Sequence, residues 1–348
     1  MLVEIPPDQS APPAAAPRPR HGARAAGLLA AFGVLALITV ASIAVGARQM
    51  PLHEVWHGLF HYSGTASDVV VRDLRVPRTL LGVLVGLGLG LSGAVMQALT
   101  RNPLAEPGLL GVNAGAAAAV VSAISFFGAD SLSEFVWWAF LGAAVVSVLV
   151  YVLGGSRSAT PVRLALAGTA AGAALIGYVN AVQLMDSKAL DKLRFWTVGS
   201  LASATVETVQ QVAPFLVVGA VLALALGRPL NAMAMGDDTA RALGANLTRT
   251  RIGAMTAITL LCGAATAACG PIAFVGLMIP HLVRVFTGPD MRWVLAYSAV
   301  LSPVLLLGAD VIGRIVTRPA ELQVGIVTAL IGGPVFIHLV RRKRTAQL

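Results

Sequence analysis

The sequence is poor in charge for its length. Only 12% of its 348 residues are charged, whereas about 25% is usual in a soluble globular domain. Hydrophobic residues make up 57% of the chain and the mean hydropathy is +0.80. An ordinary soluble domain is therefore excluded, and a separate catalytic domain has no room. The net charge of +9 comes from basic residues spread over short polar segments, which is typical of membrane topology and not of nucleic-acid binding.

Lysine and cysteine are scarce as well. The three lysines are Lys188, Lys192 and Lys343, and none follows a glycine. A Walker A phosphate loop is therefore excluded, and any ATP hydrolysis must come from another polypeptide. The two cysteines, Cys262 and Cys269, lie seven apart on one face of a predicted helix, and we interpret them as small apolar residues. G-x-S-x-G does not occur and a separate catalytic domain has no room, so we expect no enzymatic activity.

Long uncharged runs fill most of the chain. Thr79 to Thr100 contains 22 uncharged residues, enough for about 33 Å of helix and one bilayer crossing. The run from Ile252 to Val283 is too long for one span, and Gly270-Pro271 divides it in two. The ten predicted spans lie within 25–47, 79–100, 107–129, 135–156, 164–185, 208–227, 252–270, 271–286, 293–309 and 322–340. The fold class is therefore all-α and polytopic, with the short eighth span the weakest assignment.

The distribution of basic residues sets the orientation. With ten spans and both termini in the cytoplasm, 16 of the 25 Lys and Arg residues lie inside, against nine outside, as the positive-inside rule favours. Residues 1–24 are rich in proline and predict a disordered cytoplasmic tail. A cleaved signal peptide is the competing interpretation of the N-terminal segment. Residues 25–343 form the predicted membrane domain, with a cytoplasmic loop at 228–251 and a C-terminal tail at 344–348.

Three short polar segments between the predicted spans contain helix-forming patterns of their own. Two amphipathic segments, 51–60 and 190–201, are predicted to lie along the outer interface. In the inner loop, Asp237 is expected to cap a short helix that Gly244 ends. Between them Ala240, Leu243 and Ala245 offer a small apolar surface. Within the second span, Gly82, Gly86, Gly90 and Gly93 share one face, where small residues let helices approach closely.

The chain is organised around Arg75 to Gly115. The predicted span at 79–100 ends at Arg101-Asn102-Pro103, and a second proline, Pro107, follows. Because each proline lacks an N–H and restricts the residue before it, the link is a rigid, helix-breaking elbow. An elbow of this kind suits a gate or a docking surface. The echo between Asn102–Leu109 and Gly270–Leu277 is what an inverted repeat would produce, although short Gly-Pro matches also arise by chance.

The run SGAVMQALTRNPLAEPGLLGVNAG, with GPIAFVGLMIPHLVR and DVIGRIVTRPAELQVGIVTALIGGPVFIHLVRR, closely resembles the FecCD-type permeases of ABC importers for iron-siderophores, haem and cobalamin. The likeness covers roughly residues 25 to 343 and implies the type II ABC importer permease fold. It implies docking of an external substrate-binding protein at Arg75, Arg78 and Arg314. It implies coupling to the ATPase through Asp237, Asp238, Ala240, Arg241, Leu243 and Gly244. It implies a cytoplasmic gate at Asn102, Pro103, Leu104, Thr160, Pro161 and Val162, where Pro161 and Val162 replace the small hydroxyl residues of some relatives.

The resemblance also implies the partners. We expect a second permease subunit, identical or paralogous, two cytoplasmic ATPase subunits and an external binding protein, all at the bacterial cytoplasmic membrane. No cofactor or metal is expected in this chain, because ATP and Mg are bound by the partner ATPases. The expected substrate is a ferric siderophore, with haem or cobalamin as the alternative. A stand-alone secondary transporter is the rival from another class, and the lack of a carboxylate in the middle of any span weakens it.

Overall fold

The computed structural model describes residues 21–155 and 161–345, and all regular secondary structure in those ranges is helical. The elements are, in chain order, α1 (His21–Ala44), α2 (Leu52–Phe60), α3 (Ala66–Val69), the π-helix η1 (Val70–Arg75), α4 (Val76–Thr100), the 3-10 helix η2 (Pro107–Leu110), α5 (Val112–Phe127), α6 (Leu132–Leu153), α7 (Pro161–Met185), α8 (Ser187–Trp196), α9 (Val206–Ala225), α10 (Gly227–Ala234), α11 (Asp237–Ala242), α12 (Leu247–Cys269), α13 (Val275–Thr287), α14 (Met291–Val316) and α15 (Val324–Thr345).

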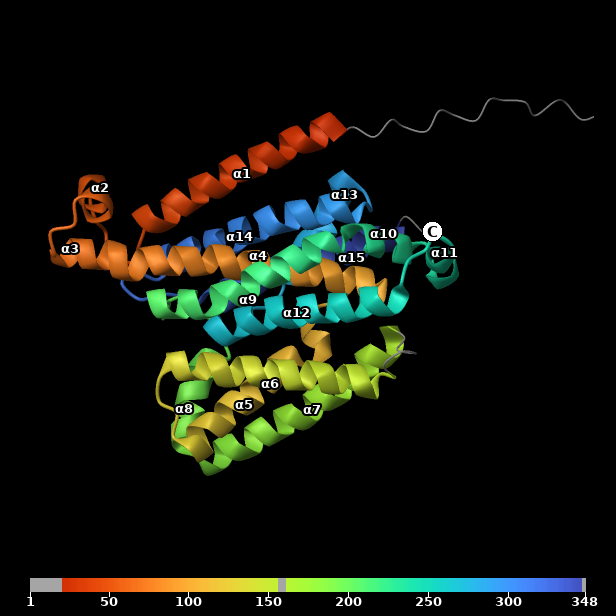
Figure 1. Ribbon diagram of the computed structural model, residues 1–348. Coiled ribbons are helices and arrows are strands. Elements are labelled where there is room, and N and C mark those ends of the chain that lie inside the picture. The colour runs from red at the N-terminus through yellow and green to blue at the C-terminus, as the bar shows by residue number, and fades with distance from the viewer. Residues whose placement is uncertain (1–20, 156–160, 346–348) are drawn as a thin grey trace, which may run out of the picture.

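Helix α4 forms the centre of the bundle. It continues α3 and η1 without a break over residues 66–100, and 78% of its most apolar stretch is buried, against 11% for α1. In Figure 1, α1 and α14 lie on one side of α4, and α5, α6 and α7 lie on the other. The other helices therefore pack, directly or through α9 and α12, around a helix that is mostly buried.

Glycines on α4 allow the neighbouring backbones to approach. A Cβ added at Gly86 would meet the backbone of Pro303 in α14, and one at Gly90 would meet Ser302. A Cβ at Gly93 would overlap the carbonyl of Gly276 in α13. The predicted glycine face is thus confirmed as the surface on which α13 and α14 rest.

The helices α5 and α13 are short because irregular segments precede them. Gly276, near the start of α13, meets Gly93 in the C-terminal third of α4, so the segment 270–274 passes into the bundle before α13 begins. Likewise η2 precedes α5, and its Leu109 carbonyl lies against Gly168 of α7. Non-helical backbone at membrane depth is tolerated only where protein surrounds it. The short eighth run of the sequence therefore corresponds to a short helix with an irregular approach.

Within residues 21–155 and 161–345, seven helices are long and apolar enough to cross a membrane, and three shorter apolar helices lie at 112–127, 275–287 and 324–338. Together they occupy the ten predicted runs. Some bounds differ from the predicted ones: α1 begins at His21, inside the predicted tail, and α12 begins at Leu247, inside the predicted loop. The rest of the predicted N-terminal tail, residues 1–20, and residues 346–348 lie outside the described residues.

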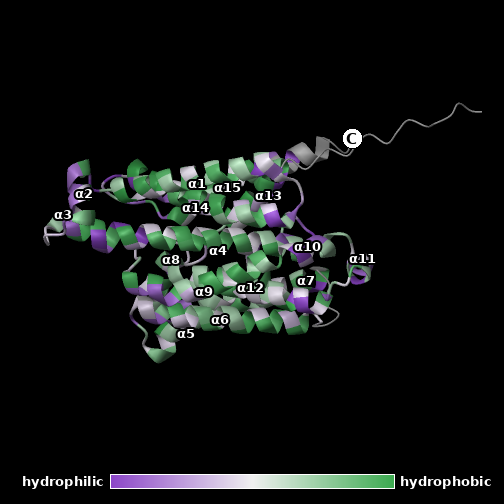
Figure 2. Ribbon diagram, turned by 45° about the horizontal axis from the view of Figure 1, so that its top comes forward, coloured by the Kyte–Doolittle hydropathy of each residue, from purple (hydrophilic) through white to green (hydrophobic). Residues whose placement is uncertain are grey.

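The two ends of the bundle carry different short helices. One end carries α2, α3 and α8 and is called the α2 end; the opposite end carries α10 and α11 and is called the α11 end (Figure 1). Hydrophilic residues gather at both ends, and apolar residues cover the lengths of the helices (Figure 2). The amphipathic segment predicted at 51–60 forms α2, and the one predicted at 190–201 overlaps α8 over residues 190–196.

The contact between Gly93 and Gly276 should be sensitive to a single methyl group. We expect Gly93→Ala to lower the free energy of unfolding by about 1–3 kcal/mol, because overpacking forces backbones apart. Gly308→Ala in α14 is the matched control, since a Cβ there meets nothing within 4 Å. Thermal unfolding of the purified variants in detergent measures both, and an equal midpoint for Gly93→Ala and wild type would contradict the packing argument.

Candidate functional site

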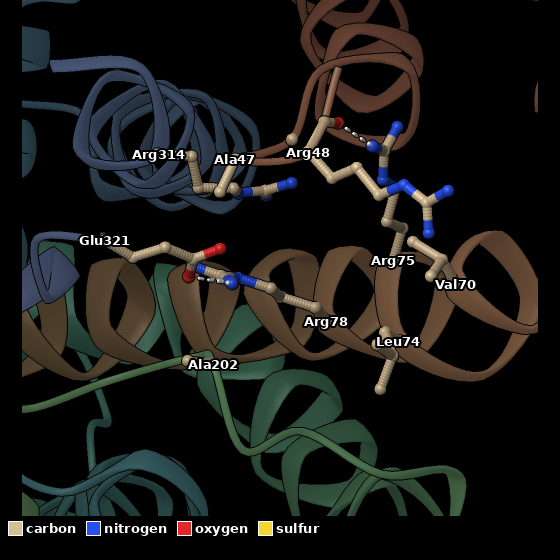
Figure 3. Close-up of a pocket in the computed structure, with 10 residues that line it drawn as sticks. Ala47, Arg48, Val70, Leu74, Arg75, Arg78, Ala202, Arg314 and Glu321 are labelled. Atoms are coloured by element: carbon tan, nitrogen blue, oxygen red, sulfur yellow. Dashed lines mark hydrogen bonds and ion pairs between the residues drawn. The ribbon is translucent and has the colours of Figure 1, made fainter. Parts of the chain in front are cut away.

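A cavity of about 290 Å³ opens at the α2 end, between α1, α4 and α14. Figure 3 shows the side chains of Arg48, Arg75, Arg78, Arg314 and Glu321 around it. The remaining lining residues are Gly46, Ala47, Val70, Leu74 and Ala202. The structure thus brings together the three arginines predicted to dock the binding protein, although Arg314 is more than 230 positions from Arg78.

Asp310 of α14 is the centre of the charge network behind this cavity. Its carboxylate is fully buried. Arg78 Nε lies 3.2 and 3.1 Å from the two carboxylate oxygens, and Arg78 Nη2 lies 2.7 Å from Oδ1. Arg314, one turn along α14, donates from Nε to Oδ2 at 3.0 Å. Because both cations share one carboxylate, the buried charge is satisfied from two helices.

The remaining donors of Arg78 and Arg314 extend the network. Arg78 Nη1 reaches Glu321 Oε2 at 2.6 Å. Arg314 donates to the carbonyl of Ser42 at 2.7 Å and to the Ser42 hydroxyl at 2.8 Å. The Ser42 hydroxyl also lies 2.8 Å from that of Thr79. Helix α1 is therefore fastened to α4 and α14 near its C-terminal end.

Arg75 is buried differently from the other two arginines. Its guanidinium donates to the carbonyls of Ile43, Ala44 and Arg48 at 2.9, 2.7 and 2.8 Å. These carbonyls lie at and just beyond the C-terminus of α1, where the helix dipole favours a cation. No carboxylate is among these acceptors, so the cavity holds a positive charge that Asp310 and Glu321 do not balance.

All three predicted docking arginines are buried and hydrogen-bonded within the chain. Sequence reasoning missed two further charged groups at the cavity. Arg48 is exposed at its rim, and Glu321 binds Arg78. A lone arginine directly after the first apolar run was the only signal for Arg48. The arrangement suits an anionic group that approaches from outside the bundle.

At the α11 end, α11 differs from its predicted form in two respects. Asp237 does not cap the helix through its side chain; Gly236 is the N-cap residue, and the Asp237 carboxylate binds Arg101 and Arg251 instead. Ala240 is fully buried, so the apolar surface that α11 offers outward is narrower than expected. Leu243 is 64% exposed. Gly244 adopts a φ of +80° and ends the helix as predicted.

Asp238 and Arg241 form an exposed pair within α11, with Arg241 Nη1 3.1 Å from Asp238 Oδ1. The ionisation of Asp237 is set by its own contacts. Partial burial alone would raise the pKa of its carboxyl, but the hydrogen bond from Arg101 and the charge of Arg251 outweigh burial and hold the pKa below the usual value. Asp237 is therefore ionised at neutral pH.

The predicted gate residues lie in two segments at the α11 end. Asn102 Oδ1 accepts the N–H of Leu104 at 2.9 Å and so folds the elbow on itself, and Leu104 is 44% exposed. Pro161 is the first residue of α7, the position where a missing N–H costs least, and Val162 is exposed. Pro103 lies between Asn102 and Leu104, and Thr160 lies outside the described residues.

Within the described residues, an all-helical bundle with seven helices long and apolar enough to cross a membrane defines the class as polytopic membrane proteins. The FecCD transport family model matches residues 34–342, and the chain belongs to that family.

Among curated relatives, the chain is 47% identical over 321 residues to the ferric enterobactin transport system permease protein FepD of Escherichia coli (strain K12), covering 90% of this chain and 96% of that one. It is 35% identical to the hemin transport system permease protein HmuU of Yersinia pestis, covering 89% and 94%. Its structure resembles that of a metal-chelate type ABC transporter in an inward-facing conformation, with a TM-score of 0.82, 28% identity and coverage of 91% and 99%. The expected family and its transport role are confirmed, and so is the expectation that the chain is not itself an enzyme.

The Asp310 network gives a stability prediction. Asp310→Asn leaves the Arg314 guanidinium buried without a carboxylate and the Arg78 guanidinium with Glu321 alone, so we expect the free energy of unfolding to fall by about 3–5 kcal/mol. Asp73→Asn, at an exposed aspartate of η1, is the control and should change stability little. Thermal unfolding in detergent compares the two variants. An unchanged midpoint for Asp310→Asn would show that the network contributes nothing to the packing of α4 on α14.

Proposed function

We propose that this chain is the membrane permease subunit of an ATP-driven importer in the bacterial cytoplasmic membrane, and that it translocates a ferric siderophore. The observation that carries the proposal is the family match, which runs from within α1 to within α15. A ferric siderophore is favoured over haem because the identity to the ferric enterobactin permease is higher than that to the hemin permease.

We infer ten spans with the α11 end in the cytoplasm. Ten apolar helices are available when the three short ones are counted with the seven long ones. The described ends of the chain, at the start of α1 and the end of α15, both lie at the α11 end (Figure 1). The arginines Arg101, Arg241 and Arg251 also lie there, in agreement with the positive-inside rule.

We further propose that two copies, or this chain and a paralogue, form the pathway. Helix α7 supports this assembly: its most apolar stretch is only 17% buried, and a Cβ at Gly172 or Gly177 would meet nothing within 4 Å. Small residues on an open face let a partner helix approach closely. The elbow at Asn102–Leu104 and the start of α7 at Thr160–Val162 are the proposed cytoplasmic gate.

ATP hydrolysis is assigned to two partner subunits that bind ATP and Mg, and α11 with Leu243 is proposed as the segment that docks on them. Leu243 is a large apolar side chain left exposed beyond the proposed spans. An exposed apolar residue on a compact helix suits burial in a partner's groove.

The first test is transport in liposomes that contain the permease, the ATPase subunits and the binding protein. Ferric enterobactin and haem, each carrying radioactive iron, are the two probes. We expect uptake of one probe only when both ATP and the ATPase subunits are present. Leu243→Asp should abolish uptake while the permease still folds, because a charge would be buried unpaired in the docking groove. Leu52→Asp, at an exposed leucine of the α2 end, is the control. Uptake driven by a proton or sodium gradient without the ATPase would refute the proposal.

The arginine-lined cavity gives a second test. We propose that Arg75, Arg78 and Arg314 supply the positive field that steers an acidic surface of the binding protein onto the α2 end. Arg75 is the residue to change, because its described acceptors are backbone carbonyls and its removal leaves the Asp310 pairs intact. Arg75→Gln should slow association and flatten its salt dependence between about 50 and 500 mM, where the Debye length falls from about 14 to about 4 Å.

The charge-preserving control for that experiment is Arg75→Lys, which should associate with a rate and a salt slope close to those of the wild type. Stopped-flow fluorescence with a labelled binding protein measures both quantities. Equal rates and equal salt slopes for Arg75→Gln and Arg75→Lys would show that the residue only braces α1.

A further inference from the structure

One carboxylate joins three separate elements at the α11 end. Asp237 is the first residue of α11, Arg101 directly follows the last residue of α4, and Arg251 lies in the first two turns of α12. Arg101 binds Asp237 Oδ1, and Arg251 Nη2 lies 2.7 Å from Oδ2. Each oxygen thus has its own cation, and each cation comes from a different helix.

The pairs are partly shielded from water, unlike most surface ion pairs. The exposed fraction is 32% for the Asp237 side chain, 15% for Arg251 and 40% for Arg101. Partial burial lessens screening, so these contacts are stronger than fully exposed ones. The more buried partner belongs to α12 and the more exposed one to the end of α4. We therefore expect the Arg101 contact to be the one that breaks and re-forms more readily.

Arg101 has an unusual backbone conformation. It is left-handed, with φ 50° and ψ 31°, and is one of two described non-glycine residues with positive φ. Residues with a side chain rarely adopt this region. It begins the elbow whose next turn is closed by Asn102 and Leu104. The ion pair therefore anchors the residue that sets the direction of the elbow.

Helix α11 is bounded by two glycines that can act as hinges. Gly236 has a φ of +104° and Gly244 a φ of +80°, and a Cβ at either would meet nothing within 4 Å. Ala240 packs inward, and the Asp237 contacts fix the N-terminal end of the helix. A force on α11 can turn it about these glycines, and Asp237 would carry that motion to Arg101.

We propose that Asp237 is the positioning residue that transmits movement of α11 to the elbow after α4, through its ion pair with Arg101. This inference rests on the proposed docking of α11 on the ATPase. In this view Arg251 holds Asp237 against α12, and the Arg101 contact makes the elbow follow α11. Loss of the carboxylate leaves the ATPase docked and active but detached from the elbow.

The neighbouring aspartate provides a matched control. Asp238 is 100% exposed and pairs with Arg241 of the same helix. Asp237→Asn and Asp238→Asn each remove one negative charge from the same turn of α11, but only the first removes a contact between helices. The whole assembly is reconstituted in liposomes for each variant, with the probe that the wild type transports, and uptake and ATP hydrolysis are measured in parallel.

We expect Asp237→Asn to reduce uptake per ATP hydrolysed by about five-fold or more, in the usual range of coupling between sites, with the rate of ATP hydrolysis retained. Asp238→Asn should lose less of the ratio than Asp237→Asn, because it removes no contact between helices, and Asp237→Glu should restore part of the ratio because the carboxylate is present again. Wild-type coupling in Asp237→Asn would overturn the proposal. So would an equal loss in both asparagine variants, which would indicate a contact with the ATPase instead.

A double-variant cycle tests the pair directly. If Arg101 and Asp237 act as a unit, Arg101→Gln reduces the ratio in the same direction, and Arg101→Gln with Asp237→Asn is no worse than Asp237→Asn alone. If instead the two single variants reduce uptake per ATP independently, so that the double variant shows the product of both losses, Arg101 is not the residue through which Asp237 acts on the elbow. Loss of the ATPase from purified Asp237→Asn assemblies would also overturn the proposal, because the residue would then act in docking.

Leu243→Asp separates failure of this inference from failure of the proposed function. If Leu243→Asp still transports normally, α11 is not the docking segment, and the proposed docking and the transmission through Asp237 both fall. If Leu243→Asp abolishes transport while Asp237→Asn retains the wild-type ratio, the docking role stands and only the transmission through Asp237 is refuted.

Discussion

The hydrocarbon of a bilayer offers no hydrogen-bonding partner, and the architecture follows from that constraint. Every backbone N–H and C=O must be satisfied within the protein, so helices fill the described chain. The irregular segment 270–274 is tolerated because it passes into the bundle between helices, whereas the elbow at 101–104 lies at the α11 end, where Arg101, Asn102 and Leu104 are exposed. That shielding depends on α4, whose glycines let α13 and α14 come close enough to enclose the approach to α13. A bulkier central helix would push these backbones apart and leave the segment 270–274 open to lipid.

The same arrangement of charges occurs at both ends of α4. At the α2 end, Arg78 of α4 shares Asp310 with Arg314. At the α11 end, Arg101 shares Asp237 with Arg251. The two clusters differ in burial, since Asp310 is fully buried and the Asp237 side chain is 32% exposed. Separating a fully buried pair is costly, whereas a hydrated pair can exchange its partner for water. The α2 end is therefore the firm end of the central helix, and the α11 end is the adjustable one.

This asymmetry suits a transporter that alternates between two states. In the proposed orientation, a firm outer end can present a fixed surface to a binding protein, while an adjustable inner end can respond to the proposed ATPase subunits as they open and close. The unbalanced charge of Arg75 and the exposed Arg48 remain available at the cavity even though the Asp310 pairs are satisfied. Under the proposed function, structural and recognition roles are thus divided among neighbouring arginines.

Local patterns determined much of this protein from its sequence alone. Uncharged runs predicted the apolar helices, the prolines after Arg101 predicted the elbow, and Gly244 predicted the end of α11, because these signals act within a few residues. The pairing of the arginines was decided only by the tertiary structure. Arg78 and Asp310 are 232 positions apart, and Arg101 and Asp237 are 136 apart. The burial of Ala240 and the binding of Asp237 away from its own helix end were likewise not predictable locally. Which side chains meet depends on the rotation and depth at which whole helices pack, and those are set by the glycine faces and irregular approaches of several helices together.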